Sequence, residues 1–256
     1  QNFTLDQSRQ LKVVKDMAFF SMSIFCTLFA VVATANLIPK DIEDRTLYTI
    51  LAKPVPRLDY LLGKYLGTVL VLGVSLICMT LLLYGVLWMR QSALLGELQI
   101  AQQVADAGGG VDEITDLQVI RDRIIEEGTS WNLLLGVLSI ALQALVLSAI
   151  TLCVSTFASS GLFTVIVAVV VFFVSYIQPV VIDFWRSTTE LGSMGSALLY
   201  LFEIAFPNFQ SFNLVDGVVT GDTLPIGPVL KIVGVAFGYV FAFLIASYLF
   251  FAKKEL

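Results

Sequence analysis

Five long stretches without a charged residue constrain this chain more than any other feature of its sequence. Residues 17–38, 65–89, 131–158, 161–182 and 232–252 contain no Asp, Glu, Lys or Arg. Each is long enough for a helix, rising about 1.5 Å per residue, to cross about 30 Å of hydrocarbon. A backbone in lipid must satisfy its own hydrogen bonds, and none of the runs alternates polar with apolar residues as barrel strands do. We therefore predict an all-α, polytopic membrane protein with five transmembrane helices in a single domain over 1–256.

The composition also indicates a chain whose main solvent is lipid. Apolar residues make up 57% of the sequence and charged residues 14%, whereas an average soluble domain has about 25% charged residues. Many of the acids sit in 97–127, so the formal charge of −5 describes that stretch rather than the membrane part. We expect the lipid bilayer as the surrounding medium and no nucleic-acid partner.

The cysteines give no sign of a disulfide or a metal site. Cys26, Cys78 and Cys153 each lie inside an apolar run without CxxC spacing, and the chain has no histidine. We interpret all three as small buried hydrophobic residues. No cofactor-binding, metal-binding or catalytic residue is predicted in this chain.

Basic residues in the short loops predict the orientation, because Lys and Arg prefer the cytoplasmic side. The loop 39–64 holds Lys40, Arg45, Lys53, Arg57 and Lys64, whereas 183–230 holds only Arg186. We therefore predict that 39–64 is cytoplasmic and that 90–130 and 183–230 are extracytoplasmic. The turn at 158–161 and the C-terminus then lie in the cytoplasm. The chain is expected to be a multi-pass protein of the plasma (inner) membrane.

The stretch 90–130 is the part with the most soluble character. It contains two helix-compatible pieces, 92–106 and 113–127, separated by three glycines at 108–110 that should break a helix. The pattern predicts a small extracytoplasmic helical hairpin on the membrane. It either packs on itself or on a symmetry mate, or it docks an extracytoplasmic partner protein.

A short apolar segment precedes the last span. Residues 191–206 end at Pro207 and carry Glu203, and they are too few to cross the hydrocarbon comfortably. We predict a re-entrant or interfacial helix. Glu203 is interpreted as an interfacial or structural residue, with a place in a proton path as the alternative.

The cytoplasmic segment 41–53 has the pattern of a short amphipathic helix. Asp41 can cap it, and Pro54 and Pro56 end it because each removes a backbone donor. One side carries Ile42, Leu47, Ile50 and Leu51, and the other carries Glu43, Asp44, Arg45 and Thr49. Taken alone, this pattern fits either a solvated connector with an anchoring face or a docking element at the membrane surface.

The order of residues in this region resembles a known family. The residues concerned are Glu43, Arg45-Thr46-Leu47, Leu51, Pro54-Val55, Arg57 and Tyr60-Leu61-Leu62-Gly63-Lys64. In type and spacing they are similar to the cytoplasmic segment after the second transmembrane helix in permeases of the type-2 class of ATP-binding-cassette (ABC) exporters. The resemblance is specific over 43–64. It extends loosely over the rest, through the hydrophobic pattern and the ending Phe-Phe-Ala-Lys-Lys-Glu-Leu.

The resemblance implies a six-helix permease whose first helix is absent from this chain, so that the five spans are helices two to six. It also implies that 41–53 is the coupling helix, which sits in a groove of a separate ATPase subunit. The ATPase-coupling residues would be Glu43, Asp44, Arg45, Thr46, Leu47, Leu51, Pro54, Arg57, Gly63 and Lys64. A second permease copy, identical or related, would complete the pathway, and ATP and Mg²⁺ would be bound by the ATPase partner.

Energy for transport is not expected from this chain itself. Gly63-Lys64 is no phosphate-binding P-loop, because Leu58 and Tyr65 occupy the positions that need Gly and Ser or Thr. We therefore predict a non-catalytic subunit. The rival interpretations are an ATP-independent secondary transporter or channel, which usually has ionisable groups at membrane depth, and a membrane scaffold subunit of a larger complex.

Overall fold

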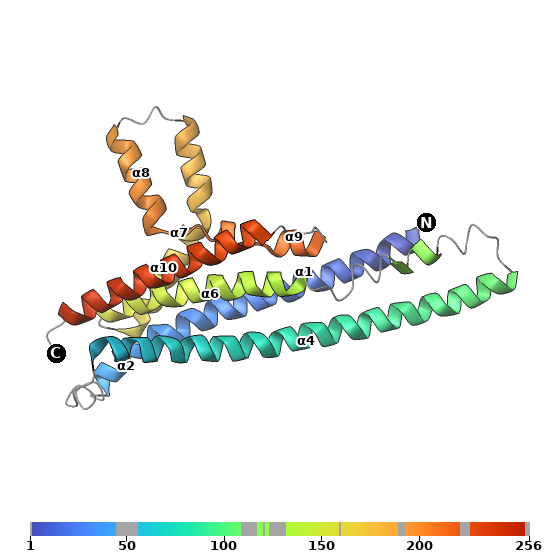
Figure 1. Ribbon diagram of the computed structural model, residues 1–256, viewed down its shortest axis with the longest axis horizontal. Helices are drawn as coiled ribbons and strands as arrows, with labels where there is room; N and C mark the ends of the chain where they lie inside the picture. The colour runs from blue at the N-terminus through green and yellow to red at the C-terminus, as the bar shows by residue number, and fades with distance from the viewer. Residues whose placement is uncertain are drawn as a thin grey trace. The chain divides into compact units, whose positions relative to one another are not determined.

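The computed structural model describes residues 2–44, 56–108, 117–119, 121–122, 132–158, 160–188, 193–220 and 226–253. The helices are α1 (Asn2–Ala35), α2 (Leu37–Glu43), α4 (Arg57–Gly108), α6 (Asn132–Phe157), α7 (Gly161–Thr188), α8 (Ser193–Ala205), η1 (Gln210–Phe212), α9 (Val215–Thr220) and α10 (Ile226–Lys253), as Figure 1 shows. The described residues are nearly all helical and contain no strand. The predicted all-α class is confirmed.

Five helical segments are long and apolar enough to cross a membrane. They are Leu11–Asp41, Leu58–Ile100, Asn132–Phe157, Gly161–Ser187 and Gly227–Ala252. Each contains a predicted charge-free run or coincides with it to within a residue. The prediction of a polytopic membrane protein with five spans is therefore confirmed.

The helix α4 extends well past the predicted span at both ends. It runs unbroken to Gly108, so the predicted piece 92–106 is a continuation of the spanning helix and not a separate element. The reason is that charged residues such as Glu97 do not break a helix. Of the second predicted piece, only 117–119 and 121–122 are described, and both are helical.

A repeat of eleven residues explains how so long a helix keeps one face inward. Buried side chains recur at Leu61, Leu72, Leu83 and Leu94, and again at Tyr65, Leu76, Leu87 and Leu98. Eleven residues make three turns at about 3.67 residues per turn, close to the natural helical period, so the stripe stays on one face. Large apolar side chains on other faces, such as Leu66, Leu70 and Leu81, are exposed. Such a surface is suited to lipid.

The chain divides into two compact units. Unit 1 comprises residues 1–23, 75–138 and 214–225, and unit 2 comprises 24–74, 139–213 and 226–256. Within unit 1, α1 and the start of α6 approach closely at Gly136, where an added Cβ would lie 2.9 Å from the ring of the buried Phe19. Glycine is needed there because any side chain would displace that ring.

Helix α6 forms the centre of unit 2. Its Leu142, Val146, Leu147 and Ile150 join a core cluster with residues of α1, α7, η1 and α10. Three of its hydroxyl groups, those of Ser148, Thr151 and Thr156, donate to its own backbone; Thr151 Oγ1, for example, donates to Leu147 O over 2.8 Å. Polar groups buried in an apolar bundle are costly unless bonded, and these local bonds let α6 carry them at the centre.

The cysteine interpretation is correct for two residues and wrong for one. Cys26 and Cys153 are buried, but Cys78 is exposed on α4. The apolar run around Cys78 does not distinguish a face turned to the protein from a face turned to lipid, because both are apolar. Cys78 lies two residues beyond the buried Leu76, on an outer face of the helix.

Candidate functional site

A one-residue joint separates α1 from α2, and α6 holds it in place. Helix α1 ends at Ala35, and its carbonyl oxygen, which the helix leaves unpaired, accepts a hydrogen bond from Ser155 Oγ over 3.2 Å. The next residue, Asn36, lies against Gly161, the first residue of α7, where a Cβ would overlap Asn36 Oδ1. The joint is therefore seated on α6 and on the start of α7.

Asp41 lies within α2 and does not cap a helix, which corrects the sequence interpretation. Because α2 begins at Leu37, Asp41 is already in its second turn. Its carboxylate oxygen Oδ2 instead accepts a hydrogen bond from Tyr60 Oη and lies 2.7 Å from Lys64 Nζ. Tyr60 and Lys64 are one turn apart on α4, so both reach the same acceptor. We call Asp41, Tyr60 and Lys64 the stem cluster, since it joins the two helices that flank residues 45–55.

Aromatic packing fixes the stem cluster to the rest of unit 2. The Tyr60 ring stacks on Phe251 near the end of α10, with centroids 5.8 Å apart and planes at 18°. Lys64 Nζ lies 5.8 Å from the centroid of the Tyr60 ring, within the range of a cation–π contact. The residue after Lys64, Tyr65, donates its Oη hydrogen to Leu145 O of α6 over 3.1 Å. The first three turns of α4 are thus bound to α2, α6 and α10.

Five of the ten predicted coupling residues are described, and they lie in the stem cluster or within a few residues of it along the chain. Glu43 ends α2 and Asp44 follows it, and both are exposed. Arg57 begins α4, and the exposed Gly63 lies beside Lys64 on an open groove of about 640 Å³ between α4 and the end of α1. Arg45, Thr46, Leu47, Leu51 and Pro54 lie outside the described residues, as does most of the predicted helix 41–53.

Three segments of unit 2 that the loop charges assign to one side lie together at one end of that unit. Tyr60 at the start of α4 contacts Phe251 at the end of α10, and Phe157 before the α6–α7 turn contacts Phe250 with ring centroids 5.7 Å apart. Asn36 lies against Gly161, where α7 begins after this turn. The joint, the turn and the end of α10 therefore share one face of the bundle.

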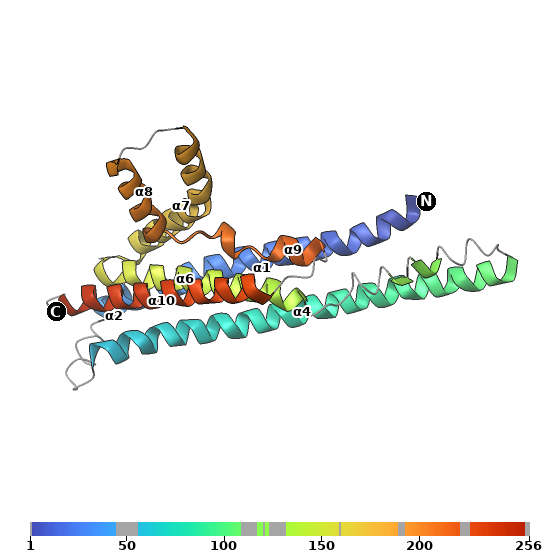
Figure 2. The ribbon, with the colours of Figure 1, turned by 45° about the horizontal axis from the view of Figure 1, so that its top comes forward.

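A proline organises the opposite part of unit 2. Pro179 lies inside α7 and has no N–H, so the carbonyl of Ser175, four residues earlier, loses its helical partner. Phe209 N–H, in the segment after α8, donates to that carbonyl over 3.3 Å. Figures 1 and 2 show α7 bending and its last turns running beside α8. The bend is a proline kink whose freed acceptor binds the returning chain.

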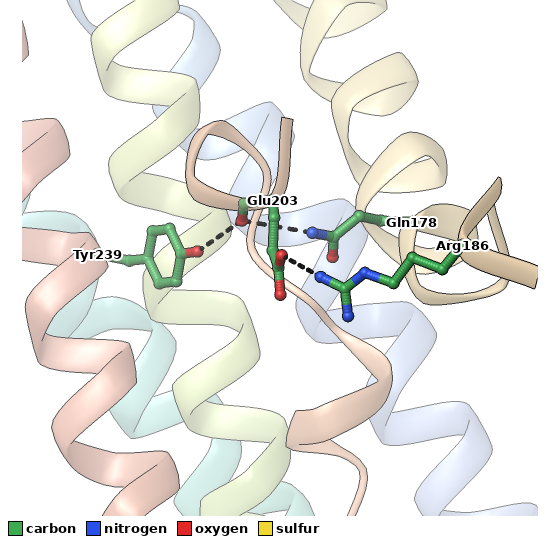
Figure 3. A network of polar contacts seen from close by, with 4 residues as sticks. All are labelled: Gln178, Arg186, Glu203 and Tyr239. Atoms are coloured by element: carbon green, nitrogen blue, oxygen red, sulfur yellow. Dashed lines mark hydrogen bonds and ion pairs between the residues drawn. The ribbon is translucent and has the colours of Figure 1, made fainter. Parts of the chain in front are cut away.

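The end of α8 is held by a second polar cluster, which Figure 3 shows. The carbonyl oxygen of Glu203, one of the last in α8, accepts hydrogen bonds from Gln178 Nε2 over 3.4 Å and from Tyr239 Oη over 3.3 Å. The Glu203 carboxylate pairs with Arg186 Nη2 at 2.9 Å. We call these four residues the Glu203 cluster. Helices α7, α8 and α10 meet in it, which agrees with the interpretation of Glu203 as a structural residue.

Sequence reasoning missed how both clusters are made. Tyr60 is part of the family-like segment 43–64 and Tyr65 directly follows it, but nothing in the sequence indicated that Phe251 packs against them. The spacing of Tyr60 and Lys64, four residues apart with an acid upstream, was the available signal for the stem cluster. For the Glu203 cluster the acceptor is a backbone carbonyl, which no residue type can reveal.

Apolar spans joined by polar links between helices define an integral membrane protein of the helical-bundle class. The family model described as ABC-2 family transporter protein matches residues 2–256. The chain therefore belongs to this family of ABC transporter membrane components, which are generally non-catalytic, and the resemblance seen at 43–64 is confirmed. No curated protein matches the chain.

Proposed function

We propose that this chain is the membrane-spanning permease subunit of an ATP-driven ABC exporter. It works with a separate ATPase subunit, which binds ATP and Mg²⁺, and with a second permease copy that is identical or related. The segment 41–53 is the coupling helix. Membership of the ABC-2 family and the stem cluster beside this segment support the proposal.

The observation that carries the coupling role is the position of Asp41. One carboxylate joins α2 to α4, so a push on residues 45–55 acts on both helices together. From α4 the displacement reaches α10 through the Tyr60–Phe251 stack and α6 through the Tyr65 hydrogen bond. Coupling needs such contiguous packed contacts, because a loose connection would absorb the movement.

The exposed acids beside the stem cluster suit a docking surface. Glu43 and Asp44 lie at the end of α2 and face solvent, and with Arg45 they offer both signs of charge to a protein partner. Such charges steer and orient association more than they stabilise the fold. We propose that the chain lies in the plasma (inner) membrane with this end of unit 2 facing the cytoplasm. The segments 90–130 and 183–230 then lie on the extracytoplasmic side.

Thiol labelling tests the orientation. Single cysteines at Thr49, Ala107 and Thr220 are introduced in a variant whose three native cysteines are replaced by alanine. A membrane-impermeant reagent applied to whole cells should label the cysteines at positions 107 and 220 and leave position 49 unlabelled. Labelling at position 49 from outside would invert the topology and remove the coupling role with it.

The experiment that tests the proposed function is purification in mild detergent followed by identification of the bound chains. We expect an ATPase subunit to co-purify, and ATP binding and hydrolysis to require it. Vesicles that hold the complex should export cargo only when ATP is supplied on the side of residues 41–53. Saturable ATP binding by the isolated chain, or transport without an ATPase, would refute the proposal.

A further inference from the structure

A charged cavity lies beside the Glu203 cluster. It has a volume of about 440 Å³ and is lined by residues of α7, α8, α10 and the segment between α8 and α10. Its polar lining includes Gln178, Asp183, Arg186, Glu203, Lys231 and Tyr239. Arg186 and Glu203 neutralise each other, whereas Asp183 and Lys231 form no ion pair with any described residue. The cavity thus offers one carboxylate and one ammonium to a ligand.

Gln178 supplies an unmet acceptor in the wall of this cavity. Its side chain is 2% exposed, and its Nε2 donates a hydrogen bond to the Glu203 carbonyl. Its Oε1 accepts no hydrogen bond from any described residue. A buried amide oxygen without a donor is unfavourable, so a ligand that brings an N–H group would be stabilised here. The C-terminal end of α8 adds a partial negative charge beside it.

An apolar groove continues from the cavity. It has a volume of about 680 Å³, lies between α8 and α10, and shares Glu203, Val235 and Tyr239 with the cavity. Small residues at Gly238, Ala242 and Ala246 leave its floor open. From Val235 to Ala246 the groove follows α10 for about 16 Å, roughly half of a 30 Å hydrocarbon layer. That is the depth that one acyl chain occupies in one leaflet.

We propose that the cavity and groove form a binding site for a single phospholipid with a primary-ammonium, zwitterionic headgroup, as in phosphatidylethanolamine. The ammonium lies at Asp183 and Gln178 Oε1, the phosphate lies at Lys231, and an acyl chain lies over Gly238, Ala242 and Ala246. A lining with two acids and two bases matches a ligand of zero net charge that carries both signs. A choline headgroup has no N–H donor for Gln178, and an anionic headgroup leaves Asp183 without a partner.

Titration of the purified full chain with short-chain lipids tests the ligand. Dihexanoyl phosphatidylethanolamine should bind saturably and at least about tenfold more tightly than the phosphatidylcholine and phosphatidylglycerol of the same chain length, since each lacks one matched charge or donor. Free phosphoethanolamine should bind at least about tenfold more weakly than the lipid, because it leaves the groove empty. Equal affinity for the three lipids would overturn the headgroup assignment, and equal affinity for free phosphoethanolamine would overturn the groove.

Variants test the residues. Asp183→Asn and Lys231→Gln should each weaken phosphatidylethanolamine binding about tenfold, and the matched controls Glu97→Gln and Arg90→Gln, which remove exposed charges of α4, should not. Unchanged affinity in both test variants would overturn the proposal.

A second pair of variants tests the groove. An added Cβ at Gly238 meets nothing within 4 Å, so Gly238→Leu starts from open space and its side chain occupies the groove. It should lower lipid affinity to that of free phosphoethanolamine, whereas Gly73→Leu, an equally open helical glycine outside the groove, should not. If Gly238→Leu dissociates a dimer and leaves lipid binding intact, the groove belongs to a second copy and the proposal is wrong. These measurements need no ATPase, so their outcome is separate from that of the proposed function.

Discussion

The stem cluster ties two helices of unit 2 together and the Glu203 cluster ties three, and the two clusters use different chemical groups. In the stem cluster the shared acceptor is the side-chain carboxylate of Asp41, and its two donors come from adjacent turns of α4. In the Glu203 cluster the shared acceptor is a backbone carbonyl, and its donors come from α7 and α10. A mutation can remove the first acceptor and cannot remove the second. Substitution can therefore remove the acceptor of the stem cluster, whereas the acceptor of the Glu203 cluster is part of the backbone and remains in every variant.

The two clusters also lie at different depths. Phe251, which stacks on Tyr60, and Tyr239 of the Glu203 cluster are both on α10 and twelve residues apart. At about 1.5 Å per residue their separation along the helix is about 18 Å, more than half the thickness of the hydrocarbon layer. Helix α10 thus connects a cluster suited to receive force with a cluster that anchors a short helix.

The largest expected effect is a loss of ATPase binding, without a loss of folding, in variants next to the stem cluster. Glu43→Ala and Arg45→Ala should each weaken ATPase binding by roughly 2–5 kcal/mol, because a charge left unpaired in an interface is costly. The free energy of unfolding should change by no more than about 0.5 kcal/mol, since Glu43 is exposed. ATPase recovery on purification and substrate efflux, both normalised to the amount in the membrane, measure the effect.

Glu97→Ala is the control for these variants, because it removes an exposed acid far along α4. It should leave recovery and efflux unchanged. If Glu43→Ala and Arg45→Ala also reach the membrane and export at the wild-type rate, the segment 41–53 is a connector only.

The next largest effect is expected when the acceptor of the stem cluster, Asp41, is removed. Asp41→Ala removes the acceptor for both Tyr60 and Lys64, whose side chains are largely shielded, and should lower the free energy of unfolding by about 2–3 kcal/mol. That value lies between those of exposed and buried ion pairs. Unfolding in an SDS titration measures it, with Asp44→Ala as a control that removes an exposed acid three residues away. Additive effects of Asp41→Ala and Lys64→Ala in the double variant would show that the pair contributes nothing.

Removing one donor at a time from the Glu203 carbonyl should lower the free energy of unfolding only slightly. Tyr239→Phe and Gln178→Met each remove one of two donors to the Glu203 carbonyl, and each should cost about 1 kcal/mol because the other donor remains. The double variant leaves that carbonyl without either donor and should cost more than the sum of the two. Tyr200→Phe, an exposed tyrosine of α8, is the control for loss of a hydroxyl. A double variant no worse than either single one would mean that water replaces the donors.

How far the sequence could predict each cluster follows from the same difference. The spans and the short helix α8 were predictable because length, absence of charge and Pro207 are local properties. The start of α2 was not, since the chain resumes a helix after the single residue Asn36 and accepts Pro39 in its first turn. The partners of Asp41 depend on tertiary packing. The Glu203 carbonyl is a group that every residue has, so its role leaves no trace in residue types.

The smallest expected effect tests whether the backbone carbonyl of Glu203, and not its carboxylate, holds α8 in place. Arg186→Gln removes the 2.9 Å ion pair with Glu203, but the two side chains are 56% and 44% exposed, so water replaces much of the interaction. The free energy of unfolding should fall by no more than about 0.5 kcal/mol. Arg186→Lys keeps the charge and should match the wild type in the same SDS titration. If Arg186→Gln costs more than Tyr239→Phe, a carboxylate holds α8 after all, and the two clusters work by the same chemistry.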